Sequence, residues 1–172
     1  MARPDLKLLE GVVAPEVLEA MNVASAALRK ANVRHVLVGG LAVGAHGFPR
    51  ATRDVDFLVG DEAFERHAGG LVTLRPGVPF QVNHVAVDFL GAEPGETFLA
   101  AALDAPAGST IGGPALVYMK LKSPRHRDLT DVIELVKAGI DVGACRAYLQ
   151  MHAPSFVAAL DAAVERARAE EG

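Results

Sequence analysis

Two aspartates, Asp54 and Asp56, stand two residues apart in a segment that alternates charged and apolar residues. Side chains two apart on a strand share a face, so a strand over 54–59 puts both carboxylates on one face and Val55 and Phe57 on the other. Adjacent carboxylates repel each other unless a cation neutralises them, and oxygen ligands suit a hard ion such as Mg²⁺. The pair indicates a metal site, and a solvated strand edge is the alternative interpretation.

A glycine pair, Gly39 and Gly40, lies upstream, and thirteen residues separate it from Asp54. The pair follows a short apolar run over 35–38, which predicts a strand, and precedes the segment 41–46, which predicts a short helix. A glycine turn that leads into a helix exposes backbone amides that can bind a phosphate. A turn that merely requires a positive φ is the alternative.

The glycine pair, the predicted aspartate strand and the spacing between them together resemble the signature of the DNA polymerase beta-like nucleotidyltransferase superfamily. Within it, the motif is similar to small bacterial nucleotidyltransferases related to the toxin of abortive-infection, type IV toxin-antitoxin systems. The residues that carry this resemblance are Gly39, Gly40, Ala42, Gly47, Arg50, Thr52, Asp54 and Asp56. The resemblance implies a nucleotidyltransferase fold and metal-dependent transfer of a nucleoside monophosphate.

The same resemblance implies further site residues. Asp88, in a predicted strand over 85–90, fits the third carboxylate, which acts as general base and shared metal ligand; a strand-end aspartate without a role is the alternative. Lys120 and Asp128 have the eight-residue spacing of a lysine that contacts the triphosphate and its aspartate partner. Asp128 and Asp131 would orient basic side chains at the cleft wall, or would simply favour a helix N-terminus.

The resemblance thus predicts a complete site. The metal ligands are Asp54, Asp56 and Asp88, which with Lys120 are also the catalytic residues, and the nucleotide ligands are Gly39, Gly40, Arg50, Thr52, Lys120 and Asp128. Two Mg²⁺ ions and a nucleoside triphosphate complete the reaction, in which an acceptor hydroxyl attacks the α-phosphate and pyrophosphate leaves. The acceptor is RNA such as tRNA, a protein or a small molecule, and an antitoxin is the expected partner.

Charge and composition exclude several other classes. The chain has 172 residues and a formal net charge of -4, which does not suit a protein that coats nucleic acid. The dense basic cluster is the segment 120–127, which is either a solvated face or a local phosphate site. A single cysteine excludes an internal disulfide, and the six histidines show no zinc-ligand spacing. Neither a targeting segment nor a membrane span is expected, which favours the cytoplasm.

Elements that must position the site follow from the hydrophobic pattern. Besides the strands named above, a strand is expected over 71–74 and helices over 15–31, 61–67, 96–103, 115–122, 129–138, 142–151 and 155–169. The predicted fold class is α/β, of the α+β type, with a mixed sheet flanked by helices. Residues 1–113 would form the core and residues 114–172 a helical part packed on it.

Two other function classes remain open on the sequence. One is a non-catalytic nucleotide-binding or partner-binding module on the same fold. The other is an antitoxin-like interaction protein, which would be indifferent to Asp56→Asn. The presence of all three carboxylates favours the enzyme.

Overall fold

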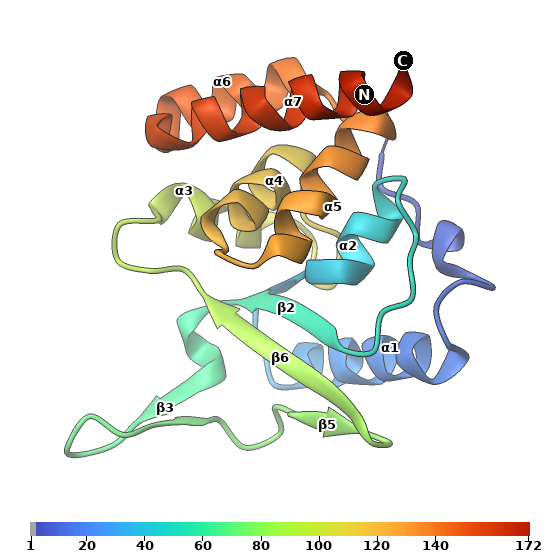
Figure 1. Cartoon of the computed structure of the whole chain (residues 1–172). Helices are drawn as coiled ribbons and strands as arrows, with labels where there is room; N and C mark the ends of the chain where they lie inside the picture. The colour runs from blue at the N-terminus through green and yellow to red at the C-terminus, as the bar shows by residue number, and fades with distance from the viewer. Residues whose placement is uncertain (1–2) are drawn as a thin grey trace.

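The computed structural model describes residues 3–172 and shows an α+β fold in which a small sheet lies between helices (Figure 1). The first long helix opens with proline in its first turn, where the missing N–H costs nothing. Short 3-10 helices are labelled η. In chain order the elements are η1 (Leu6–Leu9), α1 (Pro15–Lys30), β1 (His35–Val38), α2 (Gly39–Ala45), β2 (Val55–Val59), η2 (Asp61–Ala63), β3 (Phe64–Arg66), β4 (Val72–Leu74), β5 (Gln81–Val82), β6 (Val85–Gly91), α3 (Thr97–Ala100), η3 (Ala101–Asp104), α4 (Gly113–Lys122), α5 (His126–Lys137), α6 (Val142–His152), η4 (Pro154–Phe156) and α7 (Val157–Glu171).

The main sheet is mixed, as predicted, with strand order β1-β2-β6-β5. β1 pairs antiparallel with β2, and β2 pairs parallel with β6. In the parallel register Asp56 lies opposite Asp88, and Leu58 lies opposite Leu90. The pairing of β2 with β6 therefore brings together two aspartates that are far apart in the sequence.

Side chains of β2 alternate between two hydrophobic cores, one on each face of the sheet. Val55, Phe57 and Val59 pack in the core that α1 completes. Leu58 belongs to the opposite core, which includes residues of α4, α5, α6 and α7. Figure 1 shows α1 on one side of the sheet and these four helices on the other. The sheet is thus covered on both faces, and Asp56 shares its face with Leu58.

The helix predicted over 61–67 is wrong. After the short turn η2, the chain forms β3, which pairs antiparallel with β4 in a separate two-stranded sheet. Within this segment Ala63 is buried, Glu62 and Phe64 are half-buried and the other residues are exposed, so no apolar helical face exists to hold a helix on the core. The strand predicted over 71–74 is confirmed as β4, and the two-residue β5 was not anticipated.

The C-terminal segment is helical, as predicted, and no strand lies beyond residue 113 in the described part of the chain. Compared with the predicted ranges, α4 begins two residues early, α5 begins three residues early, and α7 begins two residues late, after the turn η4. Upstream of this segment, the helix predicted over 96–103 is divided into α3 and η3. Residues from both sides of the predicted boundary at 113, such as Val36 and Leu116, share one core. The division into two parts stays a prediction.

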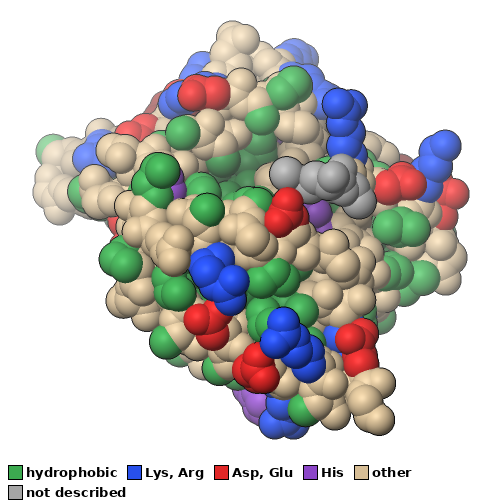
Figure 2. Space-filling model, turned by 90° about the horizontal axis from the view of Figure 1, so that it is seen from above, with side chains coloured by type: hydrophobic (Ala, Val, Ile, Leu, Met, Phe, Trp, Pro, Cys, Tyr) green, Lys and Arg blue, Asp and Glu red, His purple; other side chains and the backbone are tan. Residues whose placement is uncertain are grey.

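Charges of both signs are interspersed over the face formed by α6 and α7 (Figure 2). α7 itself carries two exposed ion pairs, Arg166 with Glu170 and Arg168 with Glu165. Exposed pairs of this kind contribute about 0–1 kcal/mol each. Across residues 3–172, the structure holds no helix with the length and apolarity that a membrane crossing requires.

Candidate active site

A cleft of about 790 Å³ lies between the sheet and the helices α4 and α5. Pockets of roughly 300–1,000 Å³ are typical of small-molecule sites. Every site residue predicted from the sequence lines this cleft, namely Gly39, Gly40, Arg50, Thr52, Asp54, Asp56, Asp88, Lys120 and Asp128. Three sequence segments that are distant from one another therefore contribute to one concave surface.

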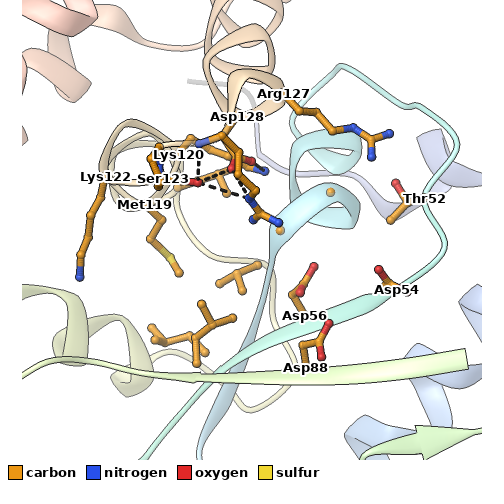
Figure 3. Close-up of a pocket in the computed structure, with 18 of the residues that line it drawn as sticks. Thr52, Asp54, Asp56, Asp88, Met119, Lys120, Lys122, Ser123, Arg127 and Asp128 are labelled. Atoms are coloured by element: carbon orange, nitrogen blue, oxygen red, sulfur yellow. Dashed lines mark hydrogen bonds and ion pairs between the residues drawn. The ribbon is translucent and has the colours of Figure 1, made fainter.

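The carboxylates form the floor of the cleft. Asp56 on β2 and Asp88 on β6 are register partners, and Figure 3 shows their side chains side by side on the neighbouring strands. β2 begins at Val55, so Asp54 lies just before the strand and the predicted strand over 54–59 starts one residue too early. Asp54 and Asp88 are exposed, whereas Asp56 is half-buried. Asp56 is therefore the carboxylate whose charge is hardest to accommodate.

Burial, and after it the negative charge of Asp88, raises the pKa of Asp56 to about 6. The positive charges of Lys120 and Arg125 lower this pKa but do not restore the ordinary value. At neutral pH Asp56 is ionised at a cost in free energy, which a bound cation would relieve. A carboxylate with a strongly raised pKa inside a cleft is typical of a functional site.

The glycine pair forms the first turn of α2, because this helix begins at Gly39 and not at residue 41 as predicted. Gly39 has a φ of +68°, a conformation that favours glycine. A Cβ atom at Gly39 would lie 2.1 Å from Oδ2 of Asp56, and one at Gly40 would lie 2.9 Å from Oγ1 of Thr52. The glycines are thus required because the backbone passes directly against these two side chains.

We expect Gly39→Ala to destabilise the protein by about 2–4 kcal/mol, because backbone strain adds to the overlap with Asp56. Gly11→Ala is the matched control, since Gly11 has a φ of +77° and no atom within 4 Å of its Cβ position. This control isolates the backbone strain, which costs roughly 1 kcal/mol. Urea unfolding of the two variants measures the difference, and equal losses would contradict the close approach of Gly39 to Asp56.

A network of charged side chains forms another wall of the cleft. The Nζ atom of Lys120 lies 2.8 Å from Oδ1 of Asp128 and 2.8 Å from Oδ2 of Asp131. Arg50 donates two hydrogen bonds to Asp131, from Nε to Oδ1 at 2.9 Å and from Nη2 to Oδ2 at 2.8 Å. Lys120, Asp128 and Asp131 are all buried. The network therefore ties the loop after α2 to α4 and α5.

This network decides between the two interpretations of Asp131. The residue lies inside α5 with its carboxylate on Arg50 and Lys120, so it orients basic side chains and does not serve the helix N-terminus. Burial raises the pKa of Asp128, but hydrogen bonds from Lys120 and Ser123 outweigh burial and the pKa falls below its ordinary value. Arg50 and Lys120 are thus both held by carboxylates, and Arg125 also pairs with Asp128, at 2.9 Å.

The basic cluster 120–127 is divided by its contacts. Lys120, Lys122 and Arg125 each pair with a carboxylate. Arg127 lines the cleft, forms no ion pair within residues 3–172, and in Figure 3 reaches across toward the side where Thr52 lies. Arg53 also lines the cleft without an ion-pair partner in the described chain. These two guanidinium groups are available to a phosphate.

Sequence reasoning missed several residues of the cleft. Arg53 was omitted, although its position directly before Asp54 was a usable signal. Leu90 and Met119 also line the cleft, and no pattern distinguishes them from core residues. Glu96 is buried at the cleft wall, where its carboxylate accepts hydrogen bonds from Tyr118 and Lys122 at 2.6 Å each. It lies directly before α3, not inside a helix as predicted.

The donor chemistry of the floor fits Mg²⁺. Magnesium binds through one or two carboxylates and completes its coordination with water and substrate phosphates. Asp56 and Asp88 supply such a pair, and Asp54 adds a third carboxylate at the start of β2. Among residues 3–172 no three His, Cys, Asp or Glu side chains form a closed group around one point.

Comparisons with known proteins show a likeness in structure. No protein-family model matches the chain, and no curated protein matches it in sequence. Among solved structures, the chain is similar to an antigenic nucleotidyltransferase-like protein from Paracoccidioides brasiliensis, at 14% sequence identity and a TM-score of 0.39. The likeness covers 86% of this chain and 95% of that one.

Proposed function

We propose that the protein is a Mg²⁺-dependent nucleotidyltransferase, which transfers a nucleoside monophosphate from a nucleoside triphosphate to an acceptor hydroxyl. The observation that carries this proposal is the register pair Asp56–Asp88, with Asp54 beside it, on the floor of the cleft. Arg53 and Arg127 border this cleft and form no ion pair in the described part of the chain. Asp54, Asp56 and Asp88 would bind two Mg²⁺ ions, each through one or two carboxylates with water and substrate phosphates as further ligands. The metal would supply charge neutralisation and activation of the acceptor hydroxyl.

The residues of the chain have separate roles in this reaction. The acceptor oxygen forms a bond to the α-phosphorus, the bond from that phosphorus to the bridging oxygen breaks, and pyrophosphate leaves. Asp88, which is exposed to the cleft, accepts the proton of the hydroxyl. Gly39, Gly40 and Thr52 bind the triphosphate from one side. Lys120 and Asp128 line the cleft from α4 and α5, and Arg50 lies beside Gly40 and Thr52. Arg53 and Arg127 bind the departing phosphates.

Labelling tests the proposal. The protein is incubated with each α-labelled nucleoside triphosphate, Mg²⁺, and whole-cell RNA and protein. We expect label in the acceptor fraction and a loss of at least about a hundredfold in Asp54→Asn. Asp104→Asn, an exposed aspartate outside the cleft, is the control and should keep full transfer. Binding of a nucleotide without transfer would instead identify a non-catalytic binding module.

We also propose an acceptor class and a biological setting for this reaction. The resemblance to abortive-infection toxins supports a bacterial cytoplasmic toxin that modifies RNA or protein and is neutralised by an antitoxin. The same assay separates the acceptors, because the label then appears in the RNA, protein or small-molecule fraction. Co-expression with the product of a neighbouring gene tests for the antitoxin, which should abolish labelling.

A further inference from the structure

The floor of the cleft changes from charged to apolar over two residues along the strands β2 and β6. Asp56 and Asp88 are register partners, and the next pair on the same face is Leu58 and Leu90. Two residues advance a strand by about 7 Å. A pair of carboxylates is therefore followed directly by a pair of leucines. Leu58 is fully buried, whereas Leu90 is 41% exposed and supplies accessible apolar surface.

The wall of the cleft that α4 forms shows the same change from charged to apolar residues. Met119 lines the cleft from α4 and is only half-buried, and the buried Leu99 and Leu116 also contribute to the lining. In Figure 3, Met119 extends into the cleft at the end away from Thr52 and Asp54. Phosphate-binding groups thus gather at one end of the cleft and apolar groups at the other.

The apolar end also has polar atoms at its border. Lys122 pairs with Glu93 at 3.1 Å and with Glu96 at 2.6 Å, which leaves one of its three N–H groups for a ligand. Oε2 of Glu96 accepts one hydrogen bond, from the backbone N–H of Glu93 at 2.8 Å, and has a second acceptor position. An apolar slot with one donor and one acceptor at its border suits a flat heteroaromatic ring with a polar edge.

We propose that the apolar end of the cleft binds the base of the donor nucleotide, between Leu90 on the floor and Met119 on α4. This inference rests on the proposed function, because the phosphates must lie at the carboxylate end. A ligand with charge at one end and an apolar ring at the other matches the two halves of the cleft. We favour the base over the acceptor as the occupant of the apolar end, because the leucine pair directly follows the aspartate pair on the same two strands.

Binding measurements with Leu90→Ser test the inference. The probes are ATP, CTP, GTP and UTP, and inorganic tripolyphosphate as a ligand without a base, all with Mg²⁺ in calorimetry. We expect binding of the preferred triphosphate to weaken about tenfold, while binding of tripolyphosphate is unchanged. Leu129→Ser is the matched control, since Leu129 is 42% exposed, lies outside the cleft and should have no effect.

Met119→Ala, from the opposite wall, should show the same selective loss, and circular dichroism confirms that both variants fold. The inference would be overturned if the variants bound the triphosphates and tripolyphosphate with equally weakened affinity, or if neither affinity changed. Unchanged nucleotide binding with a raised KM for the acceptor would assign the apolar end to the acceptor instead. If the parent protein binds the triphosphates but transfers nothing, the proposed reaction fails while the base site stands; if it binds none of them, both fail.

Discussion

We expect the Asp56→Asn variant to be more stable than the parent protein at pH 7 and to have lost nucleotidyl transfer. The pKa of Asp56 is about 6 in the folded protein, above its ordinary value of 3.8. A raised pKa means that the folded state binds the proton more tightly than the unfolded chain does. The stabilising contribution of the protonated group is present below about pH 4 and is lost as pH rises through about 6.

At pH 7 the ionised carboxylate therefore costs stability, on the order of 1–3 kcal/mol in the metal-free protein because Asp56 keeps some contact with solvent. Asparagine removes that cost, and it also removes a metal ligand. Mg²⁺ should stabilise the parent protein and should have a smaller effect on the variant.

Urea unfolding between pH 4 and pH 8, with and without Mg²⁺, measures both effects. The parent should gain stability relative to Asp56→Asn as pH falls through 6, because only the parent has the titrating carboxylate. Asp54→Asn is the control: Asp54 is exposed, so its substitution should change the unfolding free energy by less than about 0.5 kcal/mol. An Asp56→Asn variant less stable than the parent at pH 7 would show that Asp56 is not electrostatically strained.

The sequence predicts the carboxylate half of the cleft better than the rest. Asp54 and Asp56 are detectable because their spacing is local, whereas the pairing of Lys120 with Asp128 was implied by the family resemblance. The partnership of Asp56 with Asp88 depends on the pairing of two strands, for which the family resemblance and not the spacing was the guide. The contact of Arg50 with Asp131 spans 81 residues, and no local pattern encodes it.

The apolar half of the cleft could not be predicted for a different physical reason. Leu90 and Met119 have the same residue types and periodicity as leucines and methionines of the core, and only the fold decides that they face a cavity. The wrong helix over 61–67 has a similar origin. β3 is held by hydrogen bonds to β4, and the position of β4 depends on the turn between the two strands. The residues 61–67 alone therefore do not indicate that the segment pairs as a strand.

Loss of Asp131 should have the largest effect on stability. Asp131 is 1% exposed and is the shared partner of Arg50 and Lys120. In Asp131→Ala, Lys120 keeps only Asp128, and Arg50 loses both of its hydrogen bonds to a side chain. Removal of one member of a buried ion network costs about 3–5 kcal/mol, because the remaining charges stay buried without compensation.

Urea unfolding of Asp131→Ala measures this loss, and Asp161→Ala is the matched control. Asp161 pairs with Arg146, but both side chains are partly exposed, at 48% and 39%, so the control should lose only about 0–1 kcal/mol. Asp131→Asn keeps the hydrogen-bond acceptor without the charge and should lie between the parent and Asp131→Ala. Losses of the same size in Asp131→Ala and Asp161→Ala would refute the network, because the buried aspartate would then contribute no more than a surface ion pair. A selective loss would show that the shared carboxylate of Asp131 stabilises the fold more than a surface ion pair does, because it compensates the charges of both Arg50 and Lys120.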